Sequence, residues 1–227
     1  MTTEGSPSED FWSALPPDAA ADFKRRAVQR TFRSGQTLLY RGGAPDRILI
    51  VLAGRVKIVA TTPNGREVVL AFRGPGELIG ELGALDGAPR SATVEAVESV
   101  EALSVGVNTF RSFLADHPAA ALRLLEMLSR RLRDADSKRI EFSEFTTIQR
   151  VAARLLEYGR LFGREEADGC IRVPLAQEEL AGATGASIES VGRALQTMRK
   201  LKCVETRRRD IRILDGEALE ALYDAGH

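Results

Sequence analysis

The sequence predicts an α+β protein: an antiparallel β-roll, then a long central helix, then a winged helix-turn-helix at the C-terminal end. Three observations predict this order. Short β-rich runs alternate with turn residues roughly every 8 to 12 positions from Thr31 to about Leu103. After Asn108 the apolar spacing becomes helical. Residues 177–196 then carry the small residue, the glycine turn and the N-cap expected of two crossing helices.

Composition sets the broad class of the chain. Its 227 residues, 44% hydrophobic and 28% charged, suit a soluble globular protein of one large or two ordinary domains. The 32 Lys and Arg residues balance 32 Asp and Glu residues, so net charge alone indicates neither nucleic acid nor membrane. The longest apolar run, Ile48 to Ala53, is too short for a membrane span, and the N-terminus lacks signal-peptide features. We expect a cytoplasmic protein without a membrane partner.

The number and spacing of cysteine and histidine residues argue against several kinds of site. Cys170 and Cys203 lie far apart and near no histidine, which fits neither zinc nor iron–sulfur spacing, so free thiols are expected. His117 and His227 are the only histidines, which excludes a site built from many of them. The sequence has no Ser-His-Asp set, no P-loop and no metal cluster. We expect no metal and no enzymatic activity.

The N-terminal half is expected to hold residues 1–10 as a flexible tail and residues 11–120 as the β-roll domain. A helix is predicted from Phe11 to Arg30, interrupted at Leu15-Pro16-Pro17. The predicted strands are Thr37–Tyr40, Arg47–Ala53, Val56–Ala60 and Val68–Phe72. Turn signals fall at Gly42-Gly43, Gly54, Pro63-Asn64-Gly65 and Gly74-Pro75-Gly76, and Asn64-Gly65 is a strong hairpin marker. Together they indicate a small antiparallel barrel or double-sheet roll.

Residues 121–145 are predicted to form the central helix. Its apolar positions follow steps of three and four residues: Leu125, Leu128, Leu132, Ala135 and Phe142. Arg139 interrupts the seam, although its long stem can cover apolar surface. The pattern alone leaves two options open, burial against the same domain or pairing with a second copy. A break near Glu144 to Thr147 opens the last domain, residues 146–227, with a helix over Ile148–Phe162 and a polar linker over Gly163–Gly169.

Residues 76–92 combine glycines with one carboxylate and an Arg-Ser pair. Glu81 can accept hydrogen bonds from a sugar hydroxyl, while Arg90 and Ser91 can donate to phosphate oxygens. Gly80 and Gly83 lack a Cβ and let the main chain approach a ligand. A small ligand with both a sugar and a phosphate needs this chemistry. The competing interpretation is a glycine-rich turn with a surface ion pair between Glu81 and Arg90.

The helix-turn-helix prediction rests on three small or polar residues. Ala181 permits close helix crossing, Gly185 permits a left-handed turn, and Ser187 can cap the second helix. The expected buried face comprises Leu180, Ala186, Val191, Ala194 and Leu195. The expected outward residues of the second helix are Ile188, Glu189, Arg193 and Gln196.

Positive charge gathers on this part of the chain. From Ser187 to Arg212 there are eight basic residues against three acidic ones, a net of +5. The basic residues are Arg193, Arg199, Lys200, Lys202, Arg207, Arg208, Arg209 and Arg212. Two short strands over 204–214 around Arg207-Arg208-Arg209 are predicted to form a basic wing. Such charge favours DNA, and the alternative is an ordinary solvated basic surface.

A glycine-rich cassette, a central helix and a winged helix-turn-helix in this order resemble the Crp–Fnr family of bacterial transcription regulators, over roughly residues 11–214. The resemblance implies a homodimer that binds a cyclic nucleotide and a palindromic double-stranded DNA site, and that contacts RNA polymerase. Gly80 and Glu81 would lie at the ribose and Arg90 and Ser91 at the cyclic phosphate, and Leu82 and Ala92 would also belong to the ligand-binding residues. Glu189 and Arg193 match two of three base-reading positions, Ser187 would approach phosphate, and ligand binding would reposition the DNA-binding domains.

The sequence departs from the family's cyclic-AMP branch at two places. The third base-reading position is Ile188 instead of arginine, so a different DNA consensus is expected. The positions that contact adenine align with Ala135 and Asp136, and a carboxylate also pairs with guanine. Cyclic AMP is the favoured effector, with cyclic GMP, cyclic di-GMP or a ligand-independent regulator as alternatives. Residues 31–107 contain no Cys or His, which excludes the haem and iron–sulfur branch.

Overall fold

The computed structural model describes residues 10–62, 65 and 67–224. The chain divides into two compact units, Met1–Ala60 with Ala71–Asp134, and Thr61–Leu70 with Ala135–His227. None of the described helices combines the length and the apolar character needed to cross a membrane.

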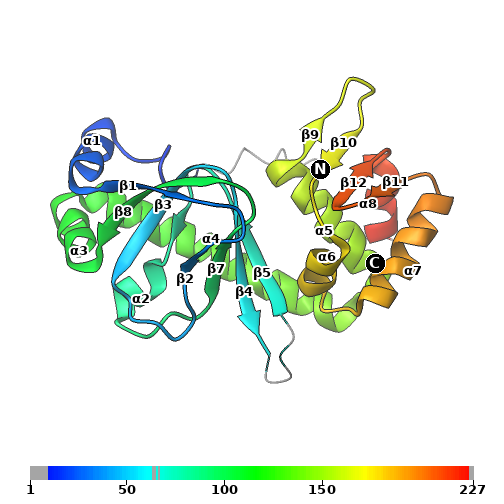
Figure 1. Ribbon diagram of the computed structural model, residues 1–227, viewed down its shortest axis with the longest axis horizontal. Helices are drawn as coiled ribbons and strands as arrows, with labels where there is room; N and C mark the ends of the chain where they lie inside the picture. Colours follow the sequence, from blue (N-terminus) through cyan, green and yellow to red (C-terminus); the bar gives the residue numbers. More distant parts are fainter. Residues whose placement is uncertain (1–9, 63–64, 66, 225–227) are drawn as a thin grey trace. The chain divides into compact units, whose positions relative to one another are not determined.

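The first unit is built on two four-stranded sheets that form the predicted β-roll (Figure 1). One sheet has the order β1-β8-β3-β6 and the other β2-β7-β4-β5. The strands are β1 (Val28–Phe32), β2 (Thr37–Leu39), β3 (Arg47–Ala53), β4 (Val56–Thr61), β5 (Glu67–Arg73), β6 (Leu78–Ile79), β7 (Thr93–Ala96) and β8 (Val100–Gly106). The four predicted strands are therefore confirmed, with shifts of one residue at some ends. Of the expected turn at Pro63-Asn64-Gly65, only Gly65 is described, with φ 76°.

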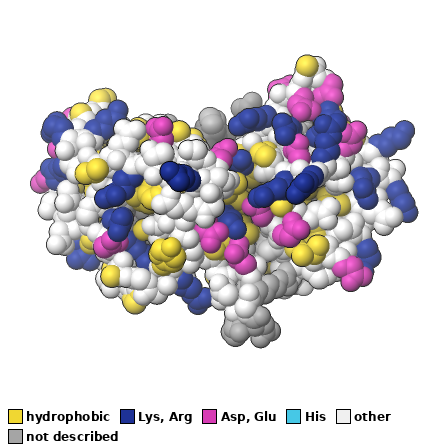
Figure 2. Space-filling model, viewed as in Figure 1, with side chains coloured by type: hydrophobic (Ala, Val, Ile, Leu, Met, Phe, Trp, Pro, Cys, Tyr) yellow, Lys and Arg dark blue, Asp and Glu magenta, His cyan; other side chains and the backbone are white. Residues whose placement is uncertain are grey.

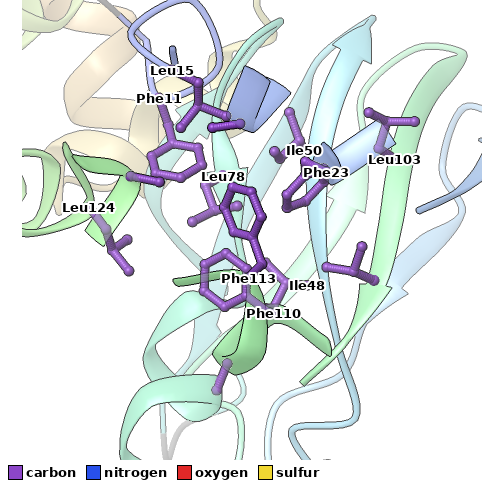
Figure 3. Packing of buried hydrophobic residues seen from close by; sticks show 14 of the residues in the cluster. Phe11, Leu15, Phe23, Ile48, Ile50, Leu78, Leu103, Phe110, Phe113 and Leu124 are labelled. Carbon is purple, nitrogen blue, oxygen red and sulfur yellow. The ribbon is translucent and has the colours of Figure 1, made fainter. Parts of the chain in front are cut away.

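Helices close the roll around an aromatic core. They are α1 (Pro17–Arg26), the short α2 (Glu81–Asp86), and α3 (Val107–Asp116). Phe23, Phe110 and Phe113 are fully or almost fully buried, and the rings of Phe23 and Phe113 meet edge to face at 5.1 Å (Figure 3). Ile48 and Leu78 from the sheet complete this cluster. A second cluster, which includes Leu49 and Val94, draws on both sheets. The core thus fixes α2 and the end of β6, where the glycine-rich cassette begins.

The predicted N-terminal helix ends earlier than expected. It was expected to reach Arg30, but α1 stops at Arg26 and Val28 begins a strand. Val28 pairs with Ser104 and Phe32 with Val100, so backbone pairing with β8 outweighs the local helical pattern. The expected tail, residues 1–10, lies outside the described residues except for Asp10.

The long helix α4 (Pro118–Glu144) confirms the predicted central helix. After a short break, α5 (Thr147–Phe162) follows its N-cap residue Thr146, whose backbone N–H donates to Oε1 of Gln149 at 2.9 Å. Val151, Leu155 and Tyr158 give α5 a buried face.

The rest of the second unit is a helix-turn-helix backed by a small sheet of order β11-β12-β10-β9 (Figure 1). The elements are β9 (Arg164–Glu165), β10 (Ile171–Val173), α6 (Gln177–Thr184), α7 (Ile188–Lys200), β11 (Val204–Arg207), β12 (Asp210–Ile213) and α8 (Gly216–Asp224). Strand β9 lies inside the segment expected as a linker, Gly163–Gly169, and β10 begins just after it. Helix α8 has no counterpart in the sequence prediction.

Candidate functional sites

The glycine-rich cassette runs from β6 through Gly80 into α2. Gly80 has φ 84°, a left-handed conformation that side chains with a Cβ rarely adopt. A Cβ at this position would lie 2.7 Å from Nη1 of Arg90 and 3.0 Å from Cδ1 of Leu39. Glycine therefore lets the backbone turn sharply beside the Arg90 guanidinium, and Glu81 becomes the first residue of α2.

Arg90 is buried and held on several sides. Its side chain is only 4% exposed; Nη1 donates to the carbonyl of Gly80 at 2.7 Å, and Nη2 donates to the carbonyl of Arg47. Nη2 also lies 3.3 Å from Oδ1 of Asp46. The backbone is fixed too, because the Arg90 N–H donates to Gly43 at 3.0 Å. These contacts use three of the five N–H donors of the guanidinium.

Asp46 supplies the negative charge beside Arg90. Its carboxylate accepts from Arg47 at 2.6 Å, and this bond lowers the pKa of Asp46. Burial acts in the opposite direction, and Arg90 makes a smaller contribution that also lowers the pKa. Asp46 is therefore ionised near neutral pH and balances one positive charge of this region.

Glu81 pairs with an arginine of the long helix. Oε1 of Glu81 accepts from Nη1 of Arg131 at 2.7 Å, and the two side chains are 8% and 18% exposed. Arg131 also donates to the carbonyl of Leu78 at 2.9 Å. The alternative interpretation, a surface ion pair between Glu81 and Arg90, is wrong, because both side chains are buried and have other partners.

A second arginine lies next to this pair. Nε of Arg73 is 3.2 Å from Glu77, and Arg131 lies 3.7 Å from the same carboxylate. Burial lowers the pKa of Arg73, and the nearby charge of Arg131 lowers it further. Two partly buried arginines, Arg73 and Arg131, thus lie next to the cassette, and Glu77 and Glu81 balance their charge.

Sequence reasoning missed Arg131 as a functional residue. The available signal is helical spacing: Arg131 precedes Ala135 by one turn of α4, so the two lie on the same side of the helix. Ala135 and Asp136 themselves belong to the second compact unit and are exposed. Asp136 lies 3.8 Å from Arg139.

The remaining cassette residues differ in accessibility. Leu82 is half exposed, Ser91 is exposed, and Ala92 is buried. Their proximity to a ligand stays a prediction. Ala92 packs into the first unit directly before β7, which accounts for a small side chain at that position.

The helix-turn-helix forms as its local signals predict. Gly185 ends α6 with φ 63°, and the Ser187 hydroxyl accepts from the backbone N–H of Ser190 at 3.1 Å. The residues expected on the buried face all have low exposure: Leu180, Ala186, Val191, Ala194 and Leu195. These contacts fix α7 on α6 and leave its other face open to solvent.

The open face of α7 carries the predicted DNA-contacting residues. Ile188 is 53% exposed, and Gln196 is also exposed. Glu189 and Arg193 form an ion pair one turn apart, and Arg193 also donates to the Ser190 hydroxyl at 3.0 Å. Figure 2 shows Lys and Arg side chains gathered over α7 and the neighbouring hairpin, at the right of the view. A cationic surface of this kind attracts phosphates.

The predicted wing is present, but one of its arginines is not part of the exposed basic surface. Arg207, Arg208 and Arg209 are exposed. Arg212 is buried and pairs with three carboxylates: Glu166 at 2.7 Å, Asp168 at 2.5 Å and Glu205 at 2.6 Å. Counting Arg212 toward the DNA-facing charge was therefore wrong. Its role is to bind β12 to β11 and to the turn between β9 and β10.

Across residues 10–62, 65 and 67–224, no group of three or more His, Cys, Asp or Glu could hold a metal ion. Cys170 and Cys203 are free thiols, and burial raises the pKa of both. Both cysteines are therefore protonated and weakly reactive near neutral pH.

Known families match both units. Residues 29–117 match the cyclic nucleotide-binding domain, and residues 149–222 match the Crp-like helix-turn-helix domain. A CRP-like cAMP-activated global transcriptional regulator from Mycobacterium tuberculosis is 33% identical over 211 residues, 92% of this chain and 94% of the relative. The chain belongs to the Crp–Fnr family. It is therefore a DNA-binding transcription regulator with a cyclic nucleotide-binding domain, and members of this family are regulators rather than enzymes.

Two further relatives share this architecture. The cyclic AMP receptor protein of Thermus thermophilus is 32% identical over 200 residues, 86% of each chain. The crystal structure of a CRP-family transcriptional regulator from the same organism has 26% identity and a TM-score of 0.74. That match covers 86% of this chain and 96% of the other. The α+β fold predicted from the sequence, a β-roll, a long helix and a winged helix-turn-helix, is confirmed.

Proposed function

We propose that this Crp–Fnr regulator is a homodimer that binds cyclic AMP in the cassette and a palindromic DNA site through α7 and the wing. The observation that carries the proposal is the state of Glu81 and Arg90. Neighbouring groups of the protein position each side chain, yet each side chain still has donor or acceptor atoms that can bind a ligand. The Mycobacterium tuberculosis relative, named as cAMP-activated, supports cyclic AMP as the effector.

The spare capacity matches the chemistry of a cyclic nucleotide. Arg90 keeps two N–H donors beyond its bonds to Gly80, Arg47 and Asp46, and a cyclic phosphate can accept both. Oε2 of Glu81 accepts no hydrogen bond from the described residues, whereas Oε1 is held by Arg131, so Oε2 can accept from the ribose 2′-hydroxyl. Because Gly80 has no Cβ, the Arg90 guanidinium lies directly beside the cassette turn.

The seam of α4 supports a homodimer. Leu128 packs partly against the core of the first unit, but other apolar residues of the seam remain exposed in a single chain, with Leu125 at 60% and Leu132 at 64%. Leu122, Ile140 and Phe142 are exposed on the same helix. Burying such side chains is worth roughly 25 cal/mol per Å² of apolar area, and a parallel pairing of two α4 helices would bury them. Two recognition helices would then read the two halves of a palindrome.

Residue identities on α7 suggest the DNA sequence that is read. Arg193 would contact guanine and Glu189 would accept from a cytosine amino group, while Ile188 could meet a thymine methyl. We expect a consensus that differs from the standard one of the cyclic-AMP branch. Action on chromosomal DNA implies a cytoplasmic protein, and contact with RNA polymerase follows as part of the same proposal.

The base of the nucleotide depends on α4. Ala135 offers no hydrogen bond from its side chain, and Asp136 can accept from the adenine amino group or pair with the donors of guanine. The ion pair of Asp136 with Arg139 would compete with either contact. Cyclic GMP is therefore the second candidate, followed by cyclic di-GMP and by a regulator that needs no ligand.

Isothermal calorimetry of the nucleotide-stripped protein with cyclic AMP and cyclic GMP tests the cassette. Glu81→Ala and Arg90→Ala should abolish binding, whereas Glu101→Ala, an exposed carboxylate of the same unit, should leave it unchanged. Asp136→Ala should alter the preference between the two nucleotides. No binding of either nucleotide by the unaltered protein would refute the cyclic AMP proposal and leave the DNA-binding assignment intact.

A further inference from the structure

The charged residues of the wing fall into two groups. At its base, Arg212 is neutralised by three carboxylates, and Arg172 pairs with Asp210 at 2.6 Å. At its tip, the Arg208 and Arg209 side chains make no ion pair or hydrogen bond with the described residues. Arg207 lies only within 3.7 Å of Glu205, and both are exposed. The unbalanced positive charge of the wing is therefore concentrated at the two-residue turn between β11 and β12.

The shape of the tip is narrow and defined. Arg207 pairs directly with Asp210 across the hairpin, which leaves Arg208 and Arg209 as the turn itself. Arg209 has φ 55°, a left-handed conformation uncommon for residues other than glycine, asparagine and aspartate. A glycine would adopt this conformation more easily than an arginine does. Arg209 therefore places a guanidinium at the tip of the turn at a conformational cost.

The tip is also held firmly relative to the recognition helix. Val204, Ile211 and Ile213 on the wing strands are buried. Arg199 in the last turn of α7 donates to the Thr206 hydroxyl of β11 at 3.2 Å. When α7 lies in a major groove, the tip is therefore carried to a fixed place beside it.

We propose that Arg208 and Arg209 enter the minor groove that flanks each half-site and favour A·T base pairs there. This inference rests on the proposed DNA binding and adds a second reading element to it. Runs of A·T narrow the minor groove and deepen its negative potential, which attracts arginine. A guanidinium is less strongly hydrated than an ammonium group, so it enters such a groove more easily than lysine. Ile188 cannot make the bidentate guanine contact that an arginine would make at this position. A second element that reads the DNA sequence, such as the wing, can supply specificity instead.

Binding sites selected from random DNA by the full-length protein, with cyclic AMP and separately without nucleotide, provide the test. The selected core is kept, and its flanks are changed to A·T runs or to G·C runs. We expect the unaltered protein to bind the A·T-flanked site about fivefold or more tightly, the size of a moderate base-pair effect. Arg208→Lys/Arg209→Lys keeps the charge and should lose most of this ratio. Arg30→Lys/Arg33→Lys, at exposed arginines of the β-roll unit, should keep it.

The outcomes separate the possible explanations. Equal affinity of the unaltered protein for both flanks would overturn the inference while the DNA-binding proposal stands. A flank ratio that survives in the lysine variant would also overturn it, because the wing would then contact phosphates only. Failure to select any site would overturn the DNA-binding proposal, and this inference with it. Thermal melting of the lysine variant should match that of the unaltered protein, since neither side chain has a partner to lose.

Discussion

The cassette and the open face of α7, called here the recognition surface, both carry a glutamate and an arginine. These residues are buried in the cassette and exposed on the recognition surface. Glu81 and Arg90 are buried, and neighbouring groups determine their orientation before any ligand arrives. Glu189 and Arg193 on α7 are 80% and 63% exposed, and their main partners are each other. A small ligand offers few atoms, so the cassette gains from groups already in place. DNA offers many phosphates, and mobile exposed cations suffice to attract it.

This difference predicts how the two regions respond to substitution. In the cassette, function and folding share the same contacts, so one change affects both. On the recognition surface, the side chains with few protein partners can change without disturbing the fold. The same substitution placed in each region therefore gives the most direct test.

The largest expected effect is Arg90→Lys compared with Arg208→Lys. Lysine at position 90 cannot serve Gly80, Arg47 and Asp46 together, and breaking a buried charged network lowers the free energy of unfolding by roughly 2–5 kcal/mol. Arg208→Lys should change it by no more than about 0.5 kcal/mol. Urea unfolding measures both. Equal stability of the two variants would show that the contacts of Arg90 do not contribute to folding, contrary to this contrast.

Arg193→Ala should produce the next largest effect, on DNA binding alone. Loss of a bidentate contact to guanine should weaken binding to the selected site by roughly 1–3 kcal/mol and relax the preference at one base pair. Fluorescence anisotropy with matched and mismatched sites measures this, with Arg30→Ala as a control at an exposed arginine of the β-roll. A uniform loss on all sequences would instead assign Arg193 to phosphate contact.

The same contrast explains what the sequence could predict. The helix-turn-helix followed closely from Ala181, Gly185 and Ser187, because crossing, turning and capping are local requirements. The pairing of Glu81 with Arg131, 50 residues apart, depends on the tertiary fold and has no local signal. The N-terminal helix was extended too far for the same reason, since β1 is formed by pairing with β8. Arg212 was assigned to the basic surface for the same reason, because its partner Glu166 lies far away in the sequence.

Arg212→Met tests a part of the C-terminal unit that resembles the cassette, because a buried arginine there also pairs with carboxylates. The substitution leaves Glu166, Asp168 and Glu205 facing one another without a cation, so the melting temperature should fall. High salt should restore part of the loss by screening the repulsion. At a temperature where the variant is folded, its salt dependence of DNA binding should equal that of the unaltered protein. A shallower salt dependence would place Arg212 among the phosphate contacts after all.

The smallest expected effect concerns acid stability of the β-roll unit. His117 donates to Asp22 at 2.9 Å, and this bond, followed by those from Arg26, lowers the pKa of Asp22 below its ordinary value of 3.8. Because the folded state favours the carboxylate, its contribution is present above about pH 4 and is lost as the pH falls further. The free energy of unfolding, measured between pH 3 and 6, should decline below pH 4, and this decline should be weaker in Asp22→Asn.

Other charged groups surround this pair. Arg25 and Arg26 face the same carboxylate, and Asp18 and Asp116 lie beside His117 and Arg26. An identical decline in Asp18→Asn and in the unaltered protein would exclude Asp18, whereas an unchanged decline in Asp22→Asn would assign the acid sensitivity elsewhere.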